Sequence, residues 1–140
     1  MIYGDVKARY ASDDTATASP ARLLTMLYDR LVTDLVSAEA AMLTKNFEAI
    51  GYRIGHAQEI LLELHSTLDI SVWPQGEALA QLYVWMITQL SDARIQLDTT
   101  KLAGVRKLVE PLRQAWHTAA VQLSQAALPA TASAGVGGLA

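Results

Sequence analysis

The chain has 140 residues, enough for one domain with its own hydrophobic core. Its net charge of −3 argues against a general nucleic-acid binder, and the absence of cysteine excludes disulfides and thiolate metal sites. Hydrophobic residues make up 51% of the chain, yet no apolar run approaches the roughly 18 residues that span a bilayer, and the N-terminus lacks the apolar stretch of a secretory signal. We therefore expect a cytoplasmic protein without membrane insertion.

Residues 1–18 carry scattered apolar side chains without a helical or strand period, and we predict a flexible arm. Residues 20–43 have the pattern of a long amphipathic helix, which Ser19 caps and Pro20 begins. Its apolar residues recur at intervals of three and four, so they form one stripe on a single face. The stripe consists of Leu24, Leu27, Leu31, Leu35, Ala38 and Met42.

Two further helices follow, one from about residue 47 to 69 and one from about 75 to 97. Trp73-Pro74 lies in the connector between them and breaks the helical period. Each helix has an apolar series that suits packing against neighbours of similar length.

A turn at Asp98–Thr100 introduces the fourth helix, whose apolar series runs from Leu102 to Leu123. Pro111 lies inside this helix, where we expect a kink, and Pro129 ends the pattern. Residues 129–140 have the composition of a disordered tail. The fold class is therefore all-α: an antiparallel up-down four-helix bundle in a single domain, residues 1–128, with a mobile N-terminal arm and a disordered C-terminal tail.

The polar residues do not form a recognisable catalytic or metal site. A di-iron bundle needs Glu-x-x-His pairs, and none of His56, His65 and His117 has a glutamate three positions before it. Glu59 and Glu63 lie four apart on one helix face, which an ordinary polar face explains better than acid–base chemistry. Nucleotide-binding and nucleophile motifs are absent from the sequence. We expect no enzymatic activity, no cofactor and no metal.

The third helix has more apolar residues than one stripe can hold. Residues 82–87 are all apolar, and at about 100° per residue they circle the helix. Some of Val84, Trp85 and Ile87 must therefore face outward or toward a second layer. A thick core, a dimer contact and a groove for an amphipathic partner helix all remain open.

Four motifs in order resemble FliS-type flagellar secretion chaperones, over about residues 10–119. The first is Thr17–Pro20 with Leu23-Leu24 and Met26–Asp29, and the second is His56–Ile60 with Leu64 and Leu68-Asp69. The third is Leu82–Met86, and the last is Ala115-Trp116.

The chain departs from the family pattern at three places. Arg30 stands where the family has glycine, His56 where it has lysine, and Val84-Trp85 where it has Asp-Tyr. The apolar framework is kept, whereas the family's lysine and aspartate are absent from these positions.

The resemblance implies a cytosolic chaperone that binds the disordered C-terminal segment of flagellin, prevents its premature polymerisation and aids delivery to the export gate of the flagellar type III apparatus. It implies no catalysis and no cofactor. We expect flagellin to bind on the second and third helices and at the arm. The predicted binding residues are Tyr10, Ile60, Leu61, Leu64, Leu68, Tyr83, Trp85 and Met86.

Two roles stay open for the arm: a lid over the groove, or, for Tyr10, a direct contact with flagellin. Two other functions also stay open. The first is a helical adaptor that forms a homodimer through its apolar face, and the second, weaker one is a bundle enzyme with a carboxylate site.

Overall fold

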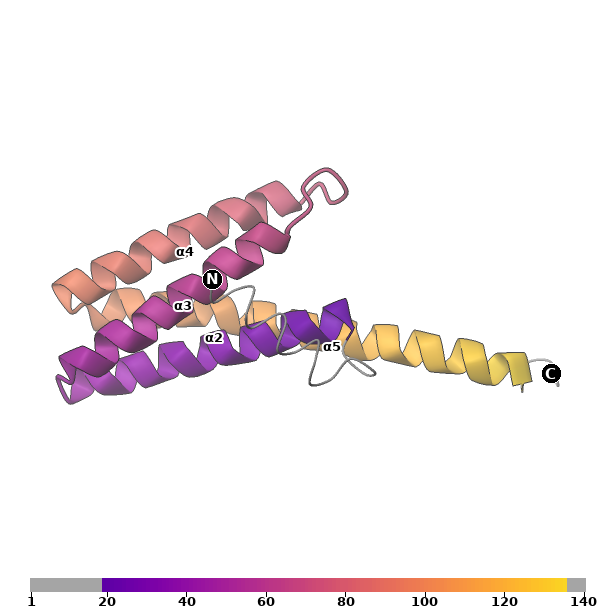
Figure 1. Cartoon of the computed structure of the whole chain (residues 1–140), viewed down its shortest axis with the longest axis horizontal. Helices are drawn as coiled ribbons and strands as arrows, with labels where there is room; N and C mark the ends of the chain where they lie inside the picture. Colours follow the sequence, from indigo (N-terminus) through magenta and orange to yellow (C-terminus); the bar gives the residue numbers. More distant parts are fainter. Residues whose placement is uncertain (1–18, 136–140) are drawn as a thin grey trace.

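The computed structural model describes residues 19–135, with side chains described as far as residue 126. The described residues form four helices and no strand: α2 (Pro20–Leu43), α3 (Phe47–Thr67), α4 (Gly76–Gln96) and α5 (Thr99–Gly135). Successive helices run in opposite directions (Figure 1), which confirms the predicted up-down bundle. The predictions for the arm, including Tyr10, lie outside the described residues.

The four helices form a closed ring in which each packs against two others. α2 and α4 both pack against α3 and α5. α2 and α4 therefore occupy opposite corners of the bundle. α5 is longer than the rest, and its C-terminal part continues well past the ends of its neighbours (Figure 1).

The helix starts follow the capping chemistry of the sequence. The Ser19 side chain accepts a hydrogen bond from the backbone N–H of Arg22 at 3.1 Å, with Pro20 in the first turn. Asn46 caps α3 in the same way, through the N–H of Ala49. Asp98 Oδ1 accepts from the N–H groups of Thr100 and Lys101 at the start of α5, which confirms the predicted turn and cap.

The helix ends show two departures from the sequence pattern. The C-cap of α4 is Leu97, which has a left-handed backbone with φ 53°. Lys45, the residue after the α2 C-cap, is left-handed too, with φ 54°. The sequence placed the end of the fourth helix at Pro129, whereas α5 continues to Gly135. A proline removes one helical hydrogen bond, and the alanine-rich sequence around Pro129 has the highest helix propensity, so the helix extends across it.

The core lies between the apolar stripes of the four helices. The predicted α2 stripe is confirmed, since all its members are buried except Leu24, which is partly buried against the core. At the centre, the hydroxyl groups of Tyr28 and Tyr83 form a hydrogen bond of 2.5 Å between α2 and α4. Burial raises the pKa of both phenols above its usual value, so the pair stays neutral and joins the opposite corners of the bundle.

Candidate partner-binding surface

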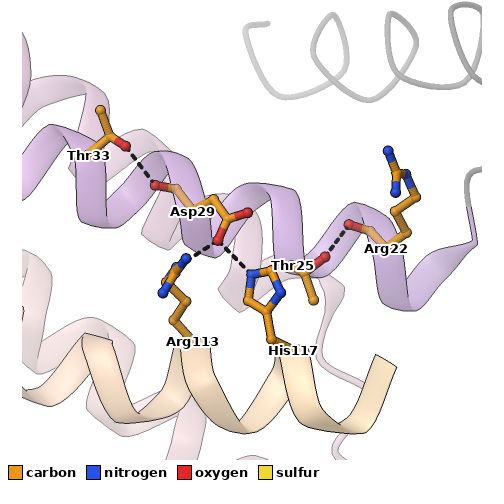
Figure 2. A network of polar contacts seen from close by, with 6 residues as sticks. All are labelled: Arg22, Thr25, Asp29, Thr33, Arg113 and His117. Atoms are coloured by element: carbon orange, nitrogen blue, oxygen red, sulfur yellow. Dashed lines mark hydrogen bonds and ion pairs between the residues drawn. The ribbon is translucent and has the colours of Figure 1, made fainter. Parts of the chain in front are cut away.

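Asp29, in the first family-like motif, ties α2 to α5. Its Oδ1 accepts hydrogen bonds from Arg113 Nε at 2.7 Å and from His117 Nε2 at 2.6 Å. Figure 2 shows both α5 side chains pointing at this carboxylate, while the hydroxyls of Thr25 and Thr33 turn to backbone carbonyls of α2 itself. Burial alone would raise the pKa of Asp29, but the hydrogen bonds and charges of His117 and Arg113 outweigh it and lower the pKa. Asp29 therefore acts as a structural anchor.

The second motif supplies ties from α3 to its two neighbours. Gln58 Nε2 donates to the backbone carbonyl of Ile87 at 3.0 Å and to Ser91 Oγ at 2.8 Å, both on α4. His56, at the position of the family's lysine, pairs through Nδ1 with Asp34 of α2. In this chain, the histidine at this position therefore lies beside a buried carboxylate.

Most of the predicted binding residues lie in the core. Buried members of the core cluster are Ile60, Leu61, Leu64, Tyr83 and Met86. Leu68 is partly buried against the core, and Tyr10 lies outside the described residues. Trp85 is 46% exposed, and it is the predicted residue that the structure places most clearly on the surface.

The α3–α4 register places a second exposed apolar pair beside Trp85. Gln58 lies across from Ile87 and Ser91, and Arg94 lies so close to Gly51 that a Cβ there would be 3.0 Å from its Nη2. One turn beyond Gln58, the antiparallel register brings Leu62, 58% exposed, opposite Val84, 51% exposed. These two side chains lie on the α3 flank of α4.

The α4–α5 register gives a matching pair on the other flank. Lys101 Nζ lies 3.6 Å from Asp92 Oδ2. Two turns from that ion pair, the antiparallel register brings Trp85 opposite Leu108, which is 40% exposed. We call Leu62, Val84, Trp85 and Leu108 the apolar band, because they cross the outer face of α4 from α3 to α5. Isolated exposed apolar residues are ordinary, but a row across three helices is the form of an interaction surface.

Glu63 is a buried carboxylate that the sequence pattern did not reveal. The pattern placed it with Glu59 on a polar face, and Glu59 is indeed exposed. Glu63 is only 4% exposed, and its Oε1 has no hydrogen-bond partner among the described residues. Burial raises its pKa to about 7. A local signal existed, since Glu63 lies three residues after Ile60 and directly before Leu64, which are both buried in the core.

The described residues offer no alternative site for metal chemistry or membrane insertion. Within residues 19–135 no three histidine or acidic side chains gather as metal ligands would. In the same range no helix has the length and apolar character needed to cross a bilayer.

Comparisons with known proteins identify the family that the sequence motifs suggest. The family model described as "Flagellar protein FliS" matches residues 3–123. A flagellar secretion chaperone FliS of Bacillus subtilis is 30% identical over 110 residues, covering 79% of this chain and 82% of its own length. Those of Vibrio cholerae and Campylobacter jejuni are 29% and 26% identical over 102 and 109 residues, covering 72% and 77% of this chain and 75% and 85% of their own lengths. The chain belongs to the FliS family of flagellar secretion chaperones.

Proposed function

We propose that this chain is a cytosolic export chaperone that binds the disordered C-terminal segment of flagellin, prevents its premature polymerisation and aids its delivery to the flagellar export gate. The relatives are named flagellar secretion chaperones, so an exported flagellar protein is the natural partner. The observation that carries the proposal is the apolar band, an exposed surface without enzymatic groups in a family of chaperones.

The shape of the apolar band suits an amphipathic helix. A disordered segment that folds on binding lays its apolar face into a shallow hydrophobic surface and gains affinity from a few large anchors. Trp85 provides such an anchor, since tryptophan contributes strongly to binding where it is partly exposed in the free protein. Tyr10 and Leu68 stay in the proposal as predicted binding residues, in addition to Trp85. The other five predicted residues are buried in the core, so we do not include them in the proposed site.

A calorimetric titration with a peptide covering the flagellin C-terminus tests this function. We expect one-to-one binding, a negative heat-capacity change from apolar burial, and a gain in helical circular dichroism as the peptide folds. Absence of heat and of helix gain at roughly 50 μM protein would contradict the proposal, because a Kd below that value would be detected.

Trp85→Ala in the same titration locates the site. The loss of a partly exposed anchor should weaken binding about 10- to 100-fold, with little change in thermal stability. The control is Val36→Ala, since Val36 is similarly exposed but lies on α2, at the opposite corner of the bundle. Equal affinity of the two variants would place the site elsewhere. Sedimentation of the free chain tests the adaptor alternative, in which the band instead joins two copies.

A further inference from the structure

We call the line along which two neighbouring helices pack a seam, and the α4–α5 seam has the fewest polar ties of the four. Three carboxylates of α2 make ion pairs across the α2–α3 and α2–α5 seams, and Gln58 bonds α3 to α4. Among the described residues, the polar side-chain contacts between α4 and α5 are those of Lys101 with Asp92 and Gln96, near the end of α4. The rest of this seam is held by apolar contact alone.

The sequences of the two helices explain this difference. Residues 78–91 of α4 contain no charged side chain. On α5, Arg106 and Arg113 turn to carboxylates of α2, as Figure 2 shows for Arg113, and Glu110 pairs with Arg106. Lys107 is exposed, and it makes no ion pair within the part of the chain that the structure describes. The α4–α5 seam is therefore apolar, with one cation on the α5 side.

Large apolar side chains follow the seam between two closed ends. The ion pair of Lys101 with Asp92 closes one end, and an edge-to-face contact of Trp73 with Trp116, with ring centroids 6.4 Å apart, closes the other. From residue 78 to residue 92 the seam is about 21 Å long, which is the length of a helix of four turns. Helical spacing from Trp85 and Leu108 places on this seam Ala78, Leu82, Leu112 and Ala115.

Gly104 leaves open space on the α5 side of this seam. It lies one turn before Leu108, and the register brings it opposite Gln89. A Cβ at Gly104 would meet no atom within 4 Å, so packing within the chain does not require glycine at this helical position. Glycine is among the poorest helix formers, and one use of it is to let another backbone approach closely. On the other flank of α4, the space beside Gly51 is filled by Arg94.

We propose that the partner segment lies lengthwise along the α4–α5 seam as a fifth helix, with its backbone nearest to α5 at Gly104. This inference rests on the proposed function, and it assigns the flagellin segment to the α5 flank of α4. Trp85 and Leu108 of the apolar band then contact the helix directly, while Leu62 and Val84 lie at its margin.

The chemistry of the seam defines the segment that it accepts. An amphipathic helix of four turns covers the apolar side chains without breaking an ion pair, because residues 78–91 offer none. Lys107 lies three residues after Gly104, on the outer side of α5. The segment therefore carries an acidic side chain beside its apolar face, which pairs with Lys107 at the edge of the contact.

Two glycine variants decide which flank of α4 is used, in a calorimetric titration of the full chain with a peptide covering the flagellin C-terminus. Gly104→Phe fills the open space and should weaken binding about 30-fold or more. The matched control is Gly55→Phe on α3, where a Cβ also meets no atom within 4 Å, and it should bind like the wild type. Equal affinities of the two variants would overturn the seam assignment and leave the flagellin function standing. Absence of binding by the wild type would overturn both.

Gly104→Ala separates close approach from any damage to the fold. Alanine is the better helix former, so this variant should melt at a higher temperature than the wild type. Its added methyl group should nevertheless weaken peptide binding about threefold, because it stands where the partner backbone lies. If Gly104→Phe proves unstable, unchanged affinity of Gly104→Ala would overturn the close approach.

A pair of charge reversals tests the acidic contact. Lys107→Glu should weaken peptide binding about fivefold at low salt, and added salt should reduce this difference. Lys45→Glu changes the net charge equally but lies in the α2–α3 turn, so it should have a much smaller effect. Equal effects of the two reversals would contradict the contact with Lys107.

Discussion

α2 and α4 lie at opposite corners of one bundle and are held in different ways. Three carboxylates tie α2 to its neighbours: Asp29 to α5, Asp34 to α3, and Glu39 to Arg106 of α5 at 2.5 Å. α4 is tied by the buried hydrogen bond between Tyr83 and Tyr28, by the two hydrogen bonds of Gln58 and by one partly exposed ion pair with Lys101.

The two helices also differ in the side chains that line their edges. The seams of α2 are lined by charged pairs, whereas both flanks of α4 carry the exposed apolar side chains of the band. α2 is held to its neighbours by ion pairs, while α4 carries the exposed apolar side chains that we propose contact a partner. If ion pairs covered the apolar side chains of α4, a partner would have to break those ion pairs on binding. The free energy lost in this way would offset the free energy gained from burying the apolar side chains.

The largest test of this comparison removes a carboxylate from each corner. Asp34→Ala should destabilise the protein by about 2–3 kcal/mol, because it leaves Arg53 and His56 beside a buried gap. Asp92→Ala, which breaks the exposed pair with Lys101, should cost less than about 1 kcal/mol. Urea unfolding of both variants measures the difference. Similar losses at the two positions would mean that α2 is not the more firmly tied helix.

Replacing Glu63, a buried carboxylate without a hydrogen-bond partner among the described residues, should stabilise the protein, unlike replacing Asp34. Glu63→Gln should stabilise the protein at pH 8 by about 1–2 kcal/mol, since an unpaired buried carboxylate is destabilising when charged. Its folded-state pKa of about 7 lies above the unfolded value near 4.5. The wild type should therefore become more stable as the pH falls from 8 to 5, and Glu63→Gln should lack that rise. Thermal melts across this range provide the measurement, and parallel pH profiles for the two proteins would refute the assignment.

The smallest expected effect concerns the strained residues after α2 and α4. Lys45→Gly and Leu97→Gly relieve left-handed backbones that cost a non-glycine residue roughly 1–2 kcal/mol. The flexibility of glycine in the unfolded chain offsets part of this, so we expect gains of about 0.5 kcal/mol. The gain at Leu97 should be the smaller one, because the Leu97 side chain is 46% exposed and the substitution removes the apolar contacts of its covered part. Calorimetric melting temperatures test both variants, and a loss of stability at Lys45 would show that the strain is absent.

The sequence predicted the helices well because their signals are local. The caps at Ser19 and Asp98 involve N–H groups two or three residues away, and the α2 stripe is a spacing of three and four residues. The structure confirms both caps and the stripe. The end of the fourth helix at Pro129 was wrong, since the favourable propensity of neighbouring alanines outweighed one lost hydrogen bond. Family membership confirms the prediction that the chain is not an enzyme.

The candidate site was less accessible to sequence reasoning because it depends on which helices become neighbours. α3 and α4 each lie between two other helices, so their buried arcs are wide and include Ile60, Leu61 and Met86. The register of α4 against α3 and α5, which the contacts of Gln58 and Lys101 define, is needed to tell that Trp85 lies on the surface and its neighbours in the core. The pairing of Asp34 with His56 joins positions 22 apart on different helices, and no local pattern reports it.

The extension of α5 beyond the bundle makes the molecule electrically lopsided. No Asp, Glu, Lys or Arg follows Arg113 in the sequence, and the last histidine, His117, pairs with Asp29 of α2 inside the bundle. The part of α5 that projects past α2 therefore has no ionisable side chain. Long-range electrostatic forces therefore act on the bundle and hardly at all on the projecting rod. A charged partner is therefore attracted or repelled by the bundle and not by the projecting part of α5. Added salt should change the rate of association at the bundle and leave association at the projecting part of α5 unaffected.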